Sequence, residues 1–427
     1  MNSSNIPNTS PSASSASTER VVHLVEAASP QTCGTTLALL AMLRAEAGER
    51  STVVLMGNSA LSDLAEAAQL RGAHRVGVPF GRAVCGLPAL RRVLSAVGPA
   101  SQIVCWSAGS LLAARVLRPT TPRVMVAVQS IGSDAGRMVR WCLRWPGMGG
   151  TRVVTLGDAL RTTLTNGPLR DWYEAVQPLP ALALRPPVPS DARGVLRTRW
   201  GVSDERVKVV AMLADPPVVV DAQLGAIAAS VARETLCDAG WPGQVAVLLH
   251  PDQWHRPRAQ LMMENLGGHF PIVLEPKLAT PWQVTAGCDL VMTMGPGAGG
   301  LALTSAMAAG LPIVAEPTPR VREWLTHNRN ARLADSGEPR FLAHEITEML
   351  SDPDSTGRLR LAARHTIAQR DEPIAPWLQA LENCNPADTS ANATAQTTAG
   401  HADEKPSAGK SADASSHDPD RRAPGYS

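Results

Sequence analysis

Residues 284–323 contain the segment in which the order and spacing of apolar and glycine residues best suit a ligand-binding site. An acidic residue and a short apolar run, Asp289–Met292, precede a glycine-dense loop at residues 295–300. A stretch that favours helix, Leu301–Ala309, follows the loop and ends at Gly310, where a helix C-cap needs a left-handed residue. Free N–H groups and the helix dipole at such a helix start favour an anion, so the pattern suits a phosphate. A tight turn without a ligand has the same spacing, and spacing alone leaves both interpretations open.

A second apolar run, Leu311–Ala315, follows the predicted helix. Strand, loop, helix and strand together predict a right-handed crossover unit of a parallel sheet. The same alternation runs through most of the chain, with a proline-rich break at residues 176–200 that suits an interdomain linker. The other buried strands are predicted at residues 21–25, 52–56, 76–79, 102–106, 123–128, 153–156, 207–213, 245–249 and 272–274, and the best-defined helices at 87–97, 339–350 and 356–370.

Residues 295–315 resemble the nucleotide-sugar loop of the family-4 glycosyltransferases of the GT-B fold. The family pattern is Glu-Gly-Phe-Gly-Leu, three residues, and then Glu-Ala-Met-Ala-x-Gly-x-Pro-Val-Val-Ala. Residues 323–333 also resemble the family's Glu-x-x-x-x-Gly-x-Asn-Gly-x-Leu. The residues that match the loop pattern are Gly300, Leu301, Ala306, Met307, Ala308, Gly310, Pro312, Val314 and Ala315.

The resemblance implies an α/β protein with two Rossmann-like domains that face each other across a cleft. Both chain ends lack an apolar period and are expected to be disordered. The implied boundaries are a disordered segment 1–19, an acceptor-side domain 20–177, a linker 178–200, a nucleotide-sugar domain 201–365, a helix 366–383 that crosses back, and a disordered tail 384–427.

The implied activity is transfer of a sugar from a nucleotide-sugar donor to an acceptor hydroxyl, usually with retention, without a metal and without a cofactor besides the donor substrate. His23, at the tip of an early strand, is a weak catalytic candidate, and a histidine packed in the core is the alternative. The donor-binding candidates are Glu275, Lys277, Gly297, Gly299, Gly300, Leu301, Thr304 and Ser305, and the acceptor-side candidates are Gly34, Trp106 and Ser107.

The sequence departs from the family pattern at charged positions. The two glutamates of the pattern fall on Gly297 and Ser305, and the arginine and lysine that face the donor diphosphate are missing from residues 214–222. Lys277 is the candidate to replace one lost cation. A helix N-terminus supplies only about half a charge, which is less than a diphosphate carries. The alternative is therefore a catalytically inactive relative that binds a partner or regulates; a sugar-nucleotide epimerase is a third, less favoured interpretation.

The amino-acid composition limits the classes of partner and the cellular compartment that are expected for this chain. A formal net charge of +2 gives no electrostatic case for a nucleic-acid partner. Seven cysteines without metal-ligand spacing argue against zinc and favour a reducing cytoplasm, and neither a signal peptide nor a membrane-spanning run is expected. Nothing in the sequence indicates an oligomeric state.

A basic amphipathic stretch, residues 136–145, is the remaining feature with two interpretations. It allows peripheral contact with anionic lipid headgroups at the inner face of the membrane. Alternatively, the arginines are simply solvated and the tryptophans pack inward. The residues concerned are Arg137, Arg140, Trp141, Arg144 and Trp145.

Overall fold

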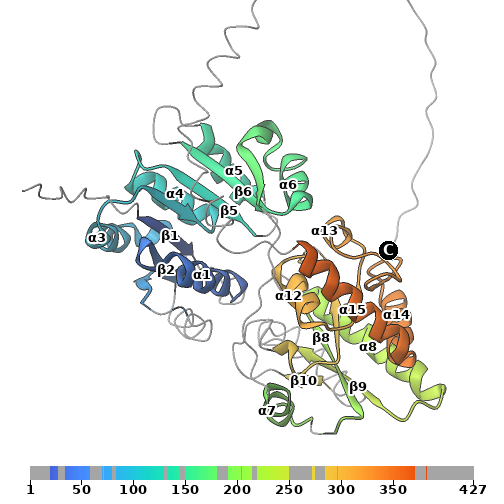
Figure 1. Cartoon of the computed structure of the whole chain (residues 1–427). Coiled ribbons are helices and arrows are strands. Elements are labelled where there is room, and N and C mark those ends of the chain that lie inside the picture. Colours follow the sequence, from blue (N-terminus) through green and yellow to red (C-terminus); the bar gives the residue numbers. More distant parts are fainter. Residues whose placement is uncertain are drawn as a thin grey trace, which may run out of the picture. The chain divides into compact units, whose positions relative to one another are not determined.

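The computed structural model of the chain describes residues 20–26, 34–57, 70, 72–78, 83–128, 133–144, 150–179, 191–202, 204–213, 219–249, 272–274, 284–295, 297–370 and 381. The described strands form two sheets, and every strand pair in them is parallel. The N-terminal lobe comprises residues 20–179 around the first sheet, and the C-terminal lobe comprises residues 191–370 around the second (Figure 1).

The first sheet has the strand order β3-β2-β1-β4-β5-β6-β7. The chain runs outward from β1 to β3 and then restarts at β4 on the other side of β1, so the order reverses between β1 and β4. Ligands of open α/β sheets bind beyond the carboxyl ends of the strands at such a reversal. The strands are β1 Val21–Glu26, β2 Ser51–Gly57, β3 His74–Gly77, β4 Gln102–Cys105, β5 Arg123–Ala127, β6 Thr151–Leu156 and β7 Val176–Leu179.

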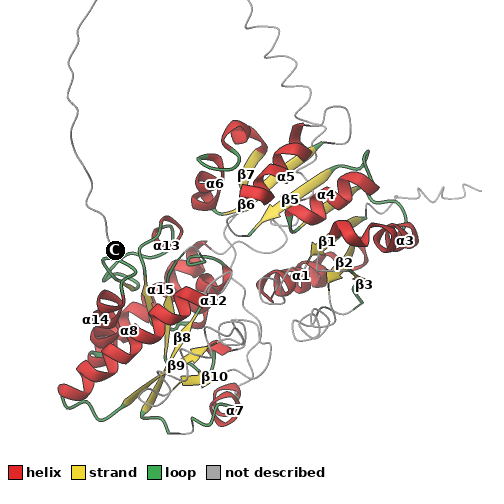
Figure 2. Cartoon of the chain, turned by 180° about the vertical axis from the view of Figure 1, so that it is seen from behind, coloured by secondary structure: helices red, strands yellow, loops and turns green. Residues whose placement is uncertain are grey.

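Helices cover both faces of the first sheet, which explains why its strands read as continuous apolar runs (Figure 2). Helix α1 (Gly34–Ala47) packs on one face through Leu39, Leu40 and Leu43. The opposite face is covered by α3 (Leu87–Val97), α4 (Ala108–Leu117), α5 (Ser133–Arg144) and α6 (Asp158–Thr165). The short 3₁₀ segments of this lobe are Gly48–Arg50, Ala83–Gly86 and Arg170–Ala175.

The second sheet has the order β10-β9-β8-β11-β12-β13, with its reversal between β8 and β11. Helix α7 (Ala192–Arg199), α12 (Leu301–Ala309) and α15 (Pro353–Arg370) contribute to one core cluster, and α8 (Val219–Asp238) and α14 (Pro339–Ser351) to the other. A short helix, α13, spans Pro319–Arg322. The strands are β8 Val207–Met212, β9 Gln244–Leu249, β10 Ile272–Leu274, β11 Leu290–Thr293, β12 Ile313–Ala315 and β13 Arg332–Leu333.

Most predicted elements are confirmed, including α3 and α12 at their predicted bounds. The third strand lies at His74–Gly77, two residues earlier than predicted. Strand β7 was missed because its Pro178 falls in the stretch interpreted as linker; proline is tolerated there because β7 is an edge strand. Helix α7 packs on the second sheet through Leu196 and Trp200. Leu381 lies in the core of the first sheet, and its carbonyl accepts a hydrogen bond from the Gln102 amide. The domain boundaries themselves stay predictions.

Candidate functional site

The glycine loop follows β11 at the carboxyl edge of the second sheet, beside the strand reversal between β8 and β11. Its last residue, Gly300, is the N-cap of α12 and has no side chain with which to cap the helix. The Gly300 carbonyl accepts the first hydrogen bonds of the helix, from the amides of Leu303 and Thr304. The helix therefore begins, with the positive end of its dipole, at the edge of the sheet where α/β proteins bind ligands.

The loop conformation needs glycine at two positions. Gly295 has a φ of 71° and Gly299 a φ of 83°, both in the left-handed region that other residues rarely adopt. A β-carbon on Gly299 would also lie 2.6 Å from the backbone carbonyl carbon of Arg320, so the loop packs directly on α13. At the far end of α12, Gly310 adopts the predicted left-handed C-cap with φ 69°. The positive φ angles explain glycine at positions 295 and 299, and the packing on α13 is a second reason for glycine at 299.

Thr304 and Ser305 lie on α12 with 3% of their surface exposed. The Ser305 hydroxyl donates to the Leu301 carbonyl at 2.7 Å, and the Thr304 hydroxyl donates to the same carbonyl at 3.1 Å. Gly297, Gly300 and Leu301 are buried as well. Neither hydroxyl projects from the helix in this conformation, so their predicted contact with a donor would require the side chains to turn.

Glu316 is a residue of this site that the sequence interpretation missed. It follows β12, and its carboxylate accepts the Gly295 amide at 2.7 Å. A β-carbon on Gly337 would lie 2.9 Å from the Glu316 carboxyl carbon. The carboxylate therefore lies against two glycines, one in the loop after β11 and one in the loop after β13. A charged residue at the end of a predicted buried strand was the available signal.

The acceptor-side candidates lie at the carboxyl edge of the first sheet. Ser107 follows β4 and caps α4, because its hydroxyl accepts the Ser110 amide at 3.0 Å. The same hydroxyl donates to the Glu26 carboxylate at 2.8 Å. Glu26, at the end of β1, was not among the predicted residues; a β-carbon on Gly109 would lie 2.0 Å from its Oε2. Gly34 begins α1. The reversal between β1 and β4 thus brings Glu26 and Ser107 together.

His23 lies in the middle of β1 rather than at its tip, between Val53 of β2 and Val104 of β4. It is 1% exposed, and burial lowers the pKa of its imidazole to about 4. The Trp106 indole N–H donates to His23 Nδ1 at 3.3 Å. Trp106 is itself 7% exposed. This is the geometry of a neutral core histidine; its catalytic role stays a prediction that the burial disfavours.

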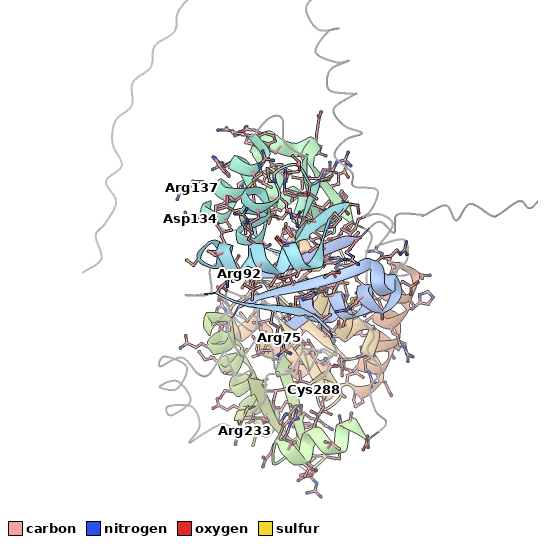
Figure 3. The ribbon with its side chains drawn as sticks, turned by 90° about the vertical axis from the view of Figure 1, so that its left-hand side faces the viewer. Arg75, Arg92, Asp134, Arg137, Arg233 and Cys288 are labelled. Carbon is pink, nitrogen blue, oxygen red and sulfur yellow. The ribbon has the colours of Figure 1, made fainter. Side chains whose placement is uncertain are left out.

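Helix α5 presents its basic residues outward. Arg137 and Arg144 are exposed, and Arg140 is half-buried. Figure 3 shows Arg137 beside Asp134, its ion-pair partner at 2.5 Å. Trp141 is 45% exposed, so the inward packing considered for the tryptophans does not occur there.

Several predicted site residues lie outside the described residues. They are Glu275, Lys277, Trp145 and the segment 214–218, which replaces the family's cation pair. Among the residues that the structure describes, no cluster of histidine, cysteine and acidic side chains is arranged to hold a metal. Within the same ranges, every helix is too short or too polar to span a membrane.

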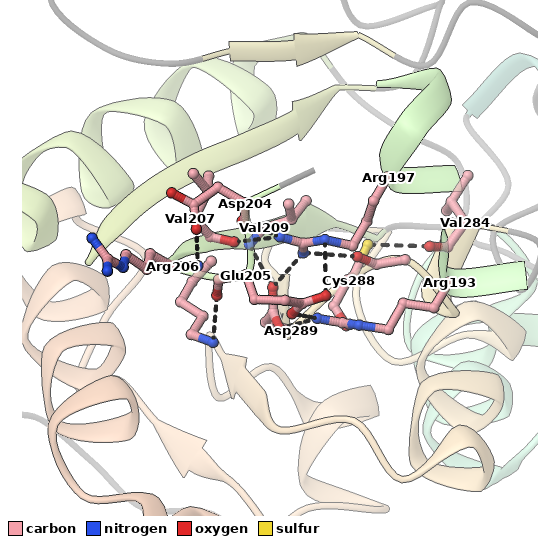
Figure 4. A network of polar contacts seen from close by, with 12 residues as sticks. Arg193, Arg197, Asp204, Glu205, Arg206, Val207, Val209, Val284, Cys288 and Asp289 are labelled. Atoms are coloured by element: carbon pink, nitrogen blue, oxygen red, sulfur yellow. Dashed lines mark hydrogen bonds and ion pairs between the residues drawn. The ribbon is translucent and has the colours of Figure 1, made fainter. Parts of the chain in front are cut away.

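The amino edge of the second sheet carries a separate polar network (Figure 4). Asp289 precedes β11 and accepts from Arg193 at 2.9 Å, from Arg197 at 3.0 Å and from the Val209 amide at 2.9 Å. The Arg197 guanidinium also donates to the carbonyls of Asp204 and Val207 at 2.8 Å. The network joins α7 to β8 and β11 on the edge opposite the glycine loop, which assigns it a structural role.

A family of known proteins matches the segment that contains the glycine loop. Residues 280–366, which include the glycine loop and α12, match the family described as "Glycosyl transferases group 1". No curated protein sequence matches the chain.

The fold of the chain is similar to solved structures over most of its length. HepE from Anabaena, in complex with UDP and glucose, has a TM-score of 0.64 at 20% identity, over 86% of this chain and 99% of its own. Sucrose-phosphate synthase from Thermosynechococcus elongatus has a TM-score of 0.61 at 14% identity, over 87% and 100%. A glycosyltransferase from Rickettsia africae has 0.61 at 13%, over 85% and 97%. The resemblance inferred from the sequence is confirmed: the chain has the GT-B fold, and its residues 280–366 match the group 1 glycosyl transferases.

Proposed function

We propose that the chain transfers a sugar from a nucleotide-sugar donor to an acceptor hydroxyl, with retention of configuration and without a metal. The observation that carries the proposal is the position of the start of α12, which follows the glycine loop at the strand reversal and lies inside the matched segment. The leaving nucleoside diphosphate develops charge in the transition state, and fixed backbone N–H groups are suited to stabilise it. The solved structures of HepE in complex with UDP-glucose and with UDP support a uridine nucleotide as the first donor to test.

In this proposal, the C-terminal lobe binds the donor and the N-terminal lobe binds the acceptor. Gly297, Gly299 and Gly300 let the loop lie close to the diphosphate, and Thr304 and Ser305 line the following turn. Ser107 and Gly34 lie on the acceptor side. The glycosyl carbon exchanges its bond to the diphosphate oxygen for a bond to the acceptor oxygen. The nucleoside diphosphate leaves, and the proton of the acceptor hydroxyl passes to the departing diphosphate.

Calorimetric titration with UDP and with GDP tests donor binding directly. We expect saturable heat with one of them, and transfer from the matching nucleotide sugar to an added acceptor. The anomeric configuration of the product, read by NMR, tests retention, and unchanged turnover in excess EDTA tests metal independence. No heat at millimolar concentrations of either nucleotide would remove this proposal and leave the inactive, partner-binding relative as the interpretation. The replaced charges at Gly297, Ser305 and residues 214–222 favour that alternative.

We also propose that the chain acts in the cytoplasm, where nucleotide sugars are made, with α5 in contact with anionic lipid at the inner membrane face. The exposed Trp141 between Arg137 and Arg144 supports the contact, because an aromatic ring flanked by cations suits the headgroup region. An acceptor carried by a lipid would then be reached at the membrane surface.

A further inference from the structure

We propose that Glu316 is the carboxylate that recognises sugar hydroxyls of the donor, in place of the two glutamates that are replaced by Gly297 and Ser305. This inference rests on the proposed function and names a residue that determines its specificity. It is carried by the place of Glu316 in the second sheet, by its hydrogen bonding and by the absence of a cationic partner among the residues that the structure describes.

The fold places Glu316 where a ligand-binding residue belongs. Its amide donates to the Thr293 carbonyl at 3.0 Å, which continues the pairing between β11 and β12 by one residue. The side chain therefore starts at the carboxyl edge of the sheet, one strand away from the reversal between β8 and β11. This is the same edge from which the glycine loop leaves β11.

The surroundings of Glu316 accommodate a carboxylate closely. The Gly295 amide fixes one oxygen at 2.7 Å. A β-carbon on Gly337 would lie 3.0 Å from each carboxylate oxygen, which is closer than side chains normally approach. Any larger residue at position 337 would push the carboxylate away from the loop. Two separate loops thus keep room for this one group.

No side chain in the described part of the chain neutralises the charge of Glu316. Within the described ranges the Gly295 amide is the only polar partner of the carboxylate, and no arginine or lysine forms an ion pair with it. A carboxylate has about four lone-pair positions, so acceptor capacity remains after one bond. The half-buried group suits neutral donors such as sugar hydroxyls, because hydrogen bonds to an ionised acceptor are about twice as strong as neutral ones. A phosphate in direct contact would be repelled.

The replaced positions do not supply this chemistry. Gly297 has no side chain, and the Ser305 hydroxyl is directed at the Leu301 carbonyl. Glu316 is therefore the carboxylate that the described structure brings to the start of the loop. The hydroxyls that bind Glu316 belong either to the ribose or to the transferred sugar. Experiments can distinguish the two because UDP contains the ribose and lacks the transferred sugar.

Calorimetry of Glu316→Gln with UDP and with UDP-glucose tests the proposal. The glutamine carbonyl can still accept the Gly295 amide, so the loop keeps its anchor while the charge is lost. We expect about tenfold weaker binding of UDP-glucose, the loss of one charge-assisted hydrogen bond. Weaker binding of UDP as well assigns the ribose, whereas unchanged UDP binding assigns the transferred sugar. Glu338→Gln, the same change on an exposed side chain nearby, is the control and should bind both ligands as the wild type does.

Unchanged or tighter binding of both ligands by Glu316→Gln would overturn the inference and leave the proposed function standing. Tighter UDP binding in particular would mean that the carboxylate repels the diphosphate. A wild-type protein that binds neither UDP nor GDP would overturn both. If it binds GDP alone, the same comparison is made with GDP and a GDP-linked sugar. Thermal unfolding of Glu316→Gln at the wild-type temperature confirms that any loss of binding comes from the missing charge and not from a disordered loop.

Discussion

Arg197 and Asp289 form an ion pair at 3.0 Å that joins α7 to the amino edge of the second sheet. The Arg197 side chain is 3% exposed and that of Asp289 is 14% exposed, so both charges are shielded from water. Such a pair is costly to break because the remaining charge stays buried and loses its nearest counter-charge. The first helix after the proline-rich stretch is therefore a fixed part of the C-terminal lobe.

Replacing Asp289 by asparagine should destabilise the protein strongly. The amide side chain can still accept the Val209 N–H, but the buried Arg197 loses its nearest counter-charge and keeps only the exposed Glu205 carboxylate at 3.7 Å. We expect a cost of about 3 kcal/mol in the free energy of unfolding. Urea unfolding measures the change. Glu205→Gln is the matched control, because its side chain is 66% exposed, and the expected loss there is below about 1 kcal/mol. Equal losses in the two variants would show that burial of the pair is unimportant.

The sequence was sufficient for the architecture and for the position of the loop. Apolar runs located most of the strands, and Gly300 and Gly310 marked both ends of α12. The direction in which a side chain points could not be predicted from the sequence. Ser305 matched a ligand-binding position, yet its hydroxyl donates to the Leu301 carbonyl. Glu316 escaped notice because its contact with Gly295 joins residues 21 positions apart and depends on the pairing of β11 with β12.

Gly299→Ala should be among the most harmful substitutions in the loop. The added methyl group would meet the Arg320 backbone at 2.6 Å, and the φ of 83° adds conformational strain. We expect a loss above about 2 kcal/mol in urea unfolding, beyond the usual range for surface changes. Gly194→Ala is the control, because a methyl group there has nothing within 4 Å and lies in α7. That variant should be unchanged or up to about 1 kcal/mol more stable.

Gly337→Ala should destabilise through Glu316 alone. The methyl group would displace the carboxylate from the Gly295 amide and remove a hydrogen bond worth about 1 kcal/mol. A double-mutant cycle with Glu316→Ala separates this effect from any other. We expect the cost of Gly337→Ala to disappear when Glu316 is already truncated, whereas a cost that persists would place the conflict elsewhere in the loop after β13.

Helix α5 should govern binding to anionic membranes. Arg137→Ala combined with Arg144→Ala should lower association with vesicles that contain phosphatidylserine by about thirtyfold, since each basic residue near such a surface contributes about 1 kcal/mol. Sedimentation with the vesicles measures this, and the wild-type signal should fall as salt rises. The control removes Arg91 and Arg92 from α3, two exposed arginines of the same lobe. Equal losses from both pairs would indicate attraction by overall charge and not by α5.

His23 should make the protein lose stability as the medium becomes acidic. Burial lowers the pKa of the imidazole to about 4 in the folded protein, whereas the unfolded chain binds the proton near pH 6.5. Between these values the unfolded state holds more protons, so stability is complete above pH 6.5 and falls as the pH drops toward 4. At pH 5 this one group accounts for about 2 kcal/mol.

His23→Asn isolates this term, because the amide oxygen can still accept the Trp106 indole N–H and does not titrate. Urea unfolding of both proteins from pH 7.5 to pH 5 should show the wild type losing about 2 kcal/mol relative to the variant over that range. Parallel pH profiles of the two proteins would mean that His23 takes up its proton in the folded state, and the imidazole would then have to be reachable from water. That single result would return His23 to the catalytic candidates, whereas the expected divergence keeps it in the core beside Trp106.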